Sequence, residues 1–362
     1  MPSPTLVDFR RGWRGILPSW PLSRRDGETS GAAIRIGVWQ SSPSLKGRVM
    51  RARWLIVVLV VFLALLAGLA WAAHRVERAA RSLVAYASSE RGDWVRTGEE
   101  ERSFSAAGAR RLAIENRVGD VKIVAGGPDV KVHAVASARV GSDAARGRGR
   151  VGISCESDGR AGLRLRIPSQ NDHSRVDLEL KIPAALAVTV ASAVGNVDIE
   201  RLTSAVAVGS GAGNITVTDC TGPIDVHTSA GTTAISNARA GVTAATGAGD
   251  VRVEGARGAV HGHTGAGTVT LDHIVSDDVK ATAGCGDVQV TRAAPFSGTM
   301  YAHTGMGTAT VALRPGSRCR VTTSVHIGNV SDGLPASVVS RSGPGLVDVS
   351  SGVGDVSVEK AG

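Results

Sequence analysis

Short polar residues follow glycine at regular intervals in this chain, and their chemistry raises the question of a metal site. The positions that carry a carboxylate or amide oxygen are Asp120, Asn196, Asn214, Asp250, Asp287, Asn329 and Asp355. Glycine–aspartate repeats of about nine residues bind Ca²⁺ because oxygen ligands reach the ion from both sides of each coil. Here the pattern comes once in 18 residues, and Thr232, Thr268 and Thr308 interrupt it. We therefore predict no metal site, but a structural ladder in which these side chains bond to the backbone at each corner.

Three histidines share one position of the repeat and are the next candidates for a metal site. His227, His263 and His303 each stand four residues before the second glycine of a glycine-rich motif. Other residues fill this position in the coils between them, so successive histidines should lie roughly 9.6 Å apart. That distance is too long for one Zn²⁺, whose ligands lie about 2 Å from the metal. His261 is closer to His263, but two histidines do not complete a site, and we expect exposed polar residues.

The other reactive residue types show no catalytic spacing. The four cysteines, Cys155, Cys220, Cys285 and Cys319, form no CxxC pair, and their order does not reveal any disulfide pairing. Ser, His and Asp are plentiful, but no nucleophile elbow is present. A polysaccharide lyase would need clustered carboxylates, basic residues and loops around a sugar. Loops are short as far as Ala281, and the repeats contain only two aromatic residues, Phe296 and Tyr301. We predict no catalytic residues and no cofactor.

A repeat positions all of these residues. From Ala193 to Val358 a GxG motif, with small variations, occurs nine times and is followed by Asp, Asn or Thr and a short alternating run. The second glycines are Gly195, Gly213, Gly231, Gly249, Gly267, Gly286, Gly307, Gly328 and Gly354. Four steps of 18 residues are followed by steps of 19, 21, 21 and 26. A fixed period of this kind indicates a repeat architecture in which stacking supplies the core.

Each 18-residue unit contains two short alternating runs, such as 224–226 and 251–253, separated by glycine-rich corners. Alternation places Val, Ile and Ala on one face and polar residues on the other. Glycine suits the corners because it tolerates positive φ angles. The sequence therefore predicts an all-β fold, a single-stranded-type β-solenoid (β-helix) of about nine coils. At roughly 4.8 Å per coil the stack would be about 43 Å long, with a narrow interior filled by side chains.

Composition and charge fit a thin stack and argue against nucleic-acid binding. Aromatic residues make up 3% of the chain, 46 residues are Gly, and all six Trp precede residue 95. The net charge of +9 is uneven, since residues 1–53 contain ten Lys/Arg and three acids, whereas residues 190–362 contain eleven and fourteen. A nucleic-acid surface needs clustered cations with stacking aromatics. The repeats lack both.

The N-terminal region predicts a membrane anchor. Residues 1–53 form a basic, disordered tail, and Trp54–Ala73 contains twenty residues without a charge, enough for a transmembrane helix. The positive-inside rule makes the tail cytoplasmic and places the rest of this single-pass protein outside the membrane. Alternatively, translation starts at Met50 and a signal peptide is cleaved near Ala72, which would release a secreted protein. Both readings place the repeats outside the cytoplasm.

The remaining chain divides into three parts. Residues 74–109 are charged and predict a juxtamembrane linker. Residues 110–192 contain an early copy of the motif, Val118–Ile123, and alternating runs that predict irregular β coils capping the N-terminal end. Residues 193–362 form the regular solenoid. No matching cap is evident at the C-terminus, so we expect weak self-association through the C-terminal edge.

Two segments carry a family resemblance. Val176–Leu202 (VDLELKIPAALAVTVASAVGNVDIERL), with the glycine–acid–valine motifs after it, resembles a widespread bacterial adhesin-like domain family of unknown function. Ile114–Ile123 resembles the opening of the same domain, so the likeness spans roughly Arg110 to the C-terminus. It implies a β-solenoid on the cell surface or in the periplasm, often tethered to a membrane. The family has no catalytic residues to transfer.

Three functions follow as hypotheses. The first is a membrane-anchored, non-catalytic binding or structural module of the cell envelope, whose partner is unidentified. The alternative is an envelope-stress sensor or signalling component that uses its basic cytoplasmic tail. A lyase-type enzyme is the least favoured, because neither a cleft nor a catalytic cluster is evident in the sequence.

Overall fold

The computed structural model describes residues 94–140, 142, 151–157, 161–167, 174–334 and 343–361. The predicted basic tail, the predicted membrane-spanning segment and most of the predicted linker lie outside these ranges. A search of the described ranges finds no helix that is both long and apolar enough to span a bilayer. Every regular element in them is a β-strand, which confirms the all-β class.

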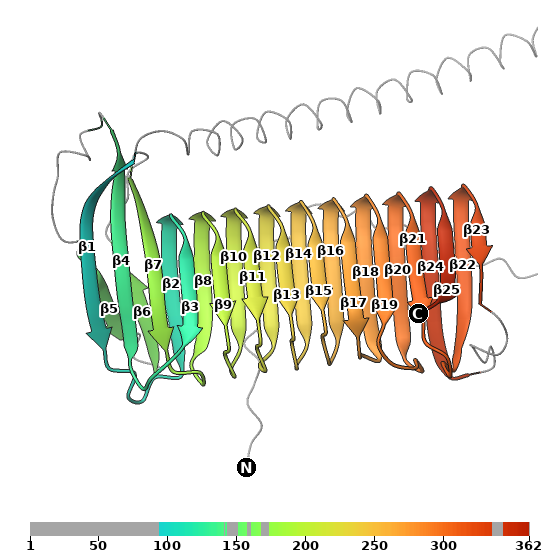
Figure 1. The fold of residues 1–362 in the computed structure, drawn as a ribbon, viewed down its shortest axis with the longest axis horizontal. Coiled ribbons are helices and arrows are strands. Elements are labelled where there is room, and N and C mark those ends of the chain that lie inside the picture. The colour runs from blue at the N-terminus through green and yellow to red at the C-terminus, as the bar shows by residue number, and fades with distance from the viewer. Residues whose placement is uncertain are drawn as a thin grey trace, which may run out of the picture. The chain divides into compact units, whose positions relative to one another are not determined.

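The strands form two sheets. Sheet A has 13 strands, in the spatial order β1 (Trp94–Phe104), β4 (Val130–Arg139), β7 (Ser174–Ile182), β3 (Val121–Ala125), β9 (Val197–Glu200), β11 (Ile215–Thr218), β13 (Thr233–Ser236), β15 (Val251–Glu254), β17 (Val269–Ile274), β19 (Val288–Arg292), β21 (Ala309–Leu313), β25 (Val356–Lys360) and β23 (Val330–Asp332). Sheet B has 12, in the order β22 (Cys319–Ile327), β24 (Gly345–Val353), β20 (Thr299–Met306), β18 (Asp278–Cys285), β16 (Val260–Ala266), β14 (Val242–Ala248), β12 (Ile224–Ala230), β10 (Val206–Ala212), β8 (Ala187–Val194), β2 (Arg111–Val118), β6 (Gly162–Arg166) and β5 (Ser154–Ser157). Figure 1 shows these strands side by side along one axis.

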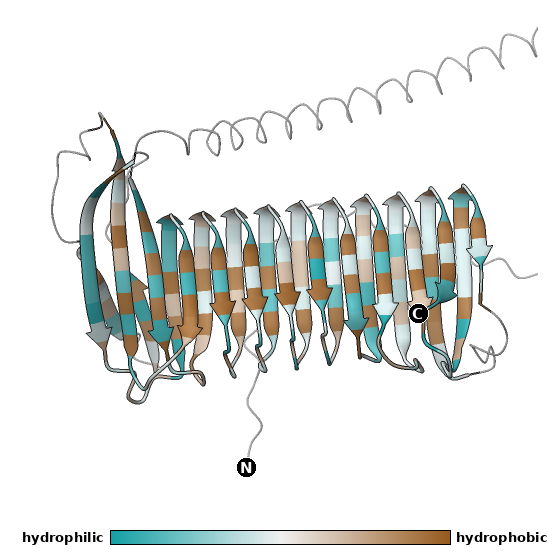
Figure 2. Cartoon of the chain, viewed as in Figure 1, coloured by the Kyte–Doolittle hydropathy of each residue, from teal (hydrophilic) through white to brown (hydrophobic). Residues whose placement is uncertain are grey.

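Each coil of the stack contributes one strand to each sheet, as expected for a β-solenoid. Strand β12 pairs in parallel with β10 and β14, and Val208, Val226 and Ala244 lie in register. Because side chains alternate along a strand, these residues point between the sheets, where they are buried. The same alternation appears in Figure 2 as apolar bands that line up from coil to coil. Small aliphatic residues therefore fill a thin core.

The early copy of the motif belongs to the stack itself. Strand β2 pairs in parallel with β8, and β3 pairs in parallel with β9, although 76 residues separate Asp120 from Asn196. Between β3 and β8 in the sequence, strands β4 to β7 lie at the N-terminal end of the stack. There β4 runs antiparallel to β7, and β5 runs antiparallel to β6. Antiparallel strands therefore close this end of both sheets.

Strand β1 lies within the range 74–109, which the sequence analysis predicts to be a linker. It pairs antiparallel with β4 and is the outermost strand of sheet A. Glu100 is its anchor: the carboxylate accepts hydrogen bonds from Arg102 Nε and from the Gly152 amide, both at 2.6 Å. The hydrogen bond from Arg102 holds the pKa of Glu100 below its usual range. The charges that suggested a linker are those of an edge strand, where charged side chains discourage further pairing.

At the C-terminal end the spatial order of the coils differs from their order in the sequence. The coil of β24 and β25 inserts between β20/β21 and β22/β23, so the chain's last coil is the second from the end. The pairing of β23 with β25 gives the physical reason, because Asp332 lies level with the core residue Val358. Inside the stack, Asp332 would be a buried carboxylate with a high desolvation cost. The coil of β24 and β25 has Val358 at the position of Asp332, and it therefore takes the interior place.

Neighbouring coils touch through their backbones at the GxG corner. The second glycine of every copy in the array has φ between +130° and +141°. A Cβ atom built on Gly213 would lie 2.1 Å from the carbonyl oxygen of Gly195 in the preceding coil. Both the positive φ and this contact exclude a side chain, so the spacing of coils depends on this glycine column.

We predict that Gly213→Ala destabilises the solenoid by about 3 kcal/mol or more, because the new Cβ collides with backbone and the φ angle is strained. Gly209→Ala is the matched control, since Gly209 lies in β10, the strand that ends one residue before Gly213, faces solvent and has no atom within 4 Å of its Cβ position. It should be neutral or slightly stabilising. Urea unfolding followed by circular dichroism measures both, and equal losses of stability in the two variants would contradict the glycine-column argument.

Candidate binding surface

The Asp and Asn residues after the GxG motifs form a hydrogen-bonded column along the stack. Asn196 Oδ1 accepts the backbone N–H of Asn214 at 3.0 Å, and Asn214 Oδ1 accepts that of Thr232 at 2.9 Å. The same bond joins Asp120 to Asn196, Asp250 to Thr268, Asp287 to Thr308 and Asp355 to Asn329, at 2.7–2.9 Å. Each side chain thus binds the corner amide of the next coil.

The threonines in this column break the chain of bonds. Across the described coils, the amides of Thr232, Thr268 and Thr308 each donate to the side chain of the preceding coil, but the threonine side chains make no bond to the next coil. From Thr232 onward the column alternates, so that an Asp supports each later Thr and the terminal Asn329. Asp355 supports Asn329, which precedes it in sequence but follows it in space. The bonds therefore follow the order of the coils in space.

A second column lies on the inner side of the same corner, and the sequence analysis missed it. Thr264 Oγ1 donates to the Gly249 carbonyl at 2.8 Å, and Thr246 Oγ1 donates to that of Gly231 at 3.1 Å. The buried members of the column are Ser192, Ser210, Thr228, Thr246, Thr264, Thr304 and Ser351. A signal was present, because Ser or Thr stands directly before the GxG motif in most copies. The full corner motif is therefore Ser/Thr, then GxG, then Asp, Asn or Thr.

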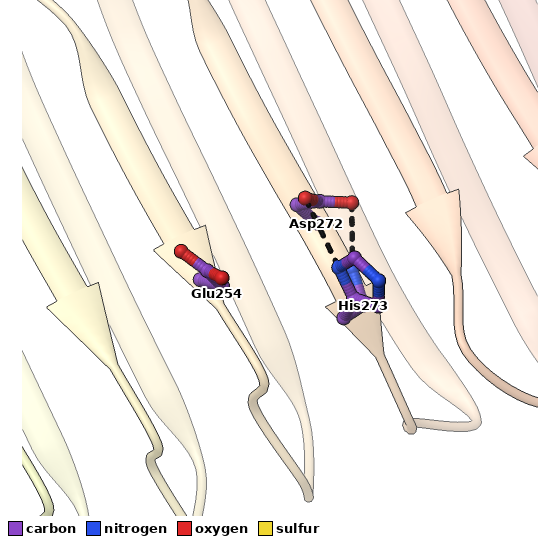
Figure 3. A group of neighbouring side chains, drawn as sticks. All are labelled: Glu254, Asp272 and His273. Atoms are coloured by element: carbon purple, nitrogen blue, oxygen red, sulfur yellow. Dashed lines mark hydrogen bonds and ion pairs between the residues drawn. The ribbon is translucent and has the colours of Figure 1, made fainter.

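At the opposite corner, the ends of β15 and β17 bring together Glu254, Asp272 and His273 (Figure 3). One possible ligand atom from each lies within 4.8 Å of the others. His273 Nδ1 is 3.0 Å from Asp272 Oδ2, and the His273 amide donates to Asp272 Oδ1. Glu254 and Asp272 are one 18-residue step apart, so the repeat itself brings them together. With Glu254 and His273 exposed, the group is a surface ion pair with a second carboxylate beside it.

Histidines gather on the outer face of sheet B. His227, His263 and His303 occupy one column, two coils apart, as the repeat predicts. His263 Nδ1 hydrogen-bonds Thr282 Oγ1 in the next coil at 2.8 Å, and His303 hydrogen-bonds Ser350. The histidines therefore bond to hydroxyl groups between the coils and do not converge on one point.

The neighbouring column of the same face adds carboxylates, a cation and an aromatic ring. His227 Nε2 lies 2.8 Å from Asp225 Oδ1, and His261 Nε2 lies 3.3 Å from Asp278 Oδ2. Tyr301 stacks on His303 with ring centroids 5.9 Å apart. We call the residues Asp225, His227, His261, His263, Lys280, Thr282, Tyr301, His303, Asp348 and Ser350 the histidine face. It offers hydrogen-bond donors, acceptors and an aromatic surface at a spacing of roughly 4.8 Å per coil.

A hollow of about 920 Å³ lies near the N-terminal end, beside β2 and β8. Charged residues of both signs line it, including Glu115, Arg117, Glu156 and Arg166. Glu156 and Arg166 lie 3.9 Å apart, so part of this charge is already paired. The hollow has no strong charge of one sign to select a ligand.

All four cysteines are free thiols in the structure. Burial raises the pKa of the Cys220 and Cys319 thiols, and it raises that of the half-buried Cys155 as well. Cys285 is exposed at the GxG corner between Gly284 and Gly286. Since thiolates react and burial disfavours them, Cys285 is the accessible thiol of this group.

The family model described as Toastrack DUF4097 matches residues 109–359. No curated protein matches the chain. A protein of Clostridium sporogenes, provisionally named a cell adhesion protein, has 11% identity and a TM-score of 0.24, covering 72% of this chain and 98% of its own. A provisionally named adhesin of Bacteroides fragilis has 13% identity and a TM-score of 0.38, covering 72% and 96%. TM-scores this low say nothing about the function of the chain.

The hydrogen bonds of the Asp/Asn column predict that substituting an Asp destabilises the protein more than substituting a Thr at an equivalent corner. Asp250→Ala should lower the free energy of unfolding by about 1 kcal/mol, because the Thr268 amide loses its acceptor. Thr268→Ala is the control, since its side chain makes no bond to the next coil, and it should change stability by less than about 0.5 kcal/mol. Denaturant titration of both variants measures the difference. A larger loss in Thr268→Ala would show that the column does not stabilise the corners.

Proposed function

The chain belongs to the Toastrack DUF4097 family, and from that premise we propose that it is a non-catalytic binding module of the cell envelope. Trp54–Ala73 anchors it in the cytoplasmic membrane, and the solenoid lies outside. The histidine face carries this proposal. It presents polar groups in straight columns across successive coils, with the aromatic ring of Tyr301 stacked on His303.

Three properties of the face suit a binding role. Its side chains project from strands whose backbones are fixed by neighbours on both sides, so binding costs little backbone entropy, and only the contacting side chains lose conformational freedom. The polar groups recur at the coil spacing and therefore match an extended partner better than a small molecule. These residues are exposed or half-buried on the outer side of sheet B, whereas small-molecule sites are usually concave and mostly apolar. We infer that the partner is an elongated component of the envelope or of a surface.

Site-specific photo-crosslinking in intact cells tests the proposed face. Thr243 is exposed on the outer side of β14 within the histidine-face column, and Gln289 is exposed on the outer side of β19 in sheet A. A photo-reactive amino acid at position 243 should yield an adduct with an envelope component, and one at position 289 should not. Tyr301→Ala with His303→Ala should reduce the adduct at least threefold. Equal adducts from both positions, or none from position 243, would refute binding by this face.

The location has its own test, which uses the natural thiol Cys285. A membrane-impermeant maleimide added to intact cells should label the full chain, and Cys285→Ser should remove most of the labelling, leaving at most a slow reaction at the half-buried Cys155. Cys220 and Cys319 should react only after denaturation, because they are buried. Labelling of Cys285 only after lysis would place the solenoid in the cytoplasm. Labelled protein in the medium would favour cleavage near Ala72. In a separate experiment, loss of signalling on deletion of residues 1–49 would favour the alternative function, an envelope-stress sensor or signalling component.

A further inference from the structure

The two ends of the stack are finished differently. At the N-terminal end, antiparallel strands close both sheets: β1 and β4 on sheet A, and β5 on sheet B. At the other end, β22 and β23 are the last strands, and each pairs on one side only among the described elements. Strand β22 has nine residues, long enough to pair with another strand.

Apolar side chains surround this open edge. Ile327 is 67% exposed and Val330 is 45% exposed. Val353 in the neighbouring coil and Met306 in the coil beyond it are level with Ile327 and are also exposed. Val321 is only partly buried, although it lies level with the fully buried Val347 of the next coil. The core of the solenoid is thus incompletely covered here. An unpaired edge combined with exposed apolar residues is the usual mark of a strand-pairing surface.

The sequence of β22 indicates what covers it. Cys-Arg-Val-Thr-Thr-Ser-Val-His-Ile is nearly symmetric about its central residue, Thr323. Counting outward from Thr323, the strand has a hydroxyl residue, a valine, a basic-type residue and an apolar residue in both directions. A strand that is symmetric in this way can pair with a second copy of itself, because a two-fold axis at Thr323 runs the copies antiparallel and places similar residues opposite each other.

We propose that two copies of this chain pair through β22 about a two-fold axis at Thr323. Val321 then lies opposite Val325 of the second copy on the inner face, so the apolar cores of the two stacks become continuous. Thr322 lies opposite Ser324 on the outer face, where hydroxyl pairs are favourable across strands. The antiparallel junction repeats the way in which β4 and β5 close the other end. This pairing is independent of the binding function proposed above.

One cross-strand pair places two basic-type side chains opposite each other, and a substitution at this pair provides the sharpest test. Arg320 lies opposite His326 of the second copy, and the symmetry repeats this pair. His326→Glu in the full chain creates two Arg–Glu pairs and should lower the dimer Kd roughly threefold to tenfold, measured by analytical ultracentrifugation in detergent. Gln289→Glu, on the outer face of β19 in an interior coil, should leave the Kd unchanged. A weaker dimer with His326→Glu, or no dimer at any concentration, would overturn the proposal.

Thr323→Cys tests the position of the axis. In a Cys285→Ser background, oxidation should convert this variant into a disulfide-linked dimer, because the two Thr323 residues face each other across the two-fold. Thr270→Cys, on sheet A in an interior coil, is the matched control and should remain a monomer on denaturing gels. Failure of Thr323→Cys to cross-link while the native chain sediments as a dimer would place the contact elsewhere. Cross-linking to a different protein would show that another partner covers the edge.

Discussion

The contact on which the rest of the structure depends is the backbone approach at the GxG corner. There a glycine with a positive φ angle lies against the carbonyl group of the glycine in the preceding coil, with no room for a Cβ atom between them. A steric constraint of this kind fixes the position of one coil relative to the next more strictly than apolar packing does. The inner residues, by contrast, tolerate Val, Ile, Leu, Ala or Met, as the core shows.

Once the glycines are fixed, the flanking positions follow. The residue before the motif points inward and is small, and Thr246, Thr264, Thr304 and Ser351 donate from this position to a glycine carbonyl. The residue after it meets the next corner amide, which selects Asp or Asn where that bond forms. The outer faces of the strands carry no such requirement. The residues that fix the stack and those of the outer columns are therefore different positions of the same repeat, and the outer columns can vary while the stack persists.

The period and the corners could be predicted from the sequence because they depend on local geometry. The recurrence of GxG predicts coils, and Val118–Ile123 is identifiable as a copy despite its distance from the array. The exchange of the last two coils could not be found in this way, since both have the motif. It depends on Asp332. The desolvation cost of burying this carboxylate becomes evident only when the structure shows that Asp332 lies level with the core residue Val358. The Glu254–Asp272 contact was accessible in principle, because one period separates the two residues. Strand β1 was missed because the charges of an edge strand and of a linker look alike.

The same constraint explains where the irregular parts of the chain lie. A long insertion between two interior coils would have to leave and re-enter the stack without separating their glycines, and only the loop corner away from the GxG motif allows this. The excursion between β3 and β8 satisfies the condition by placing its strands at the N-terminal end, so that Gly119 still contacts Gly195. At the other end, β24 and β25 lie next to β20 and β21, so that Gly354 remains on Gly307 and Gly328 lies on Gly354. The largest departures from the repeat therefore lie at the ends of the stack, whereas the interior coils show only small ones, such as the register shift between β17 and β19.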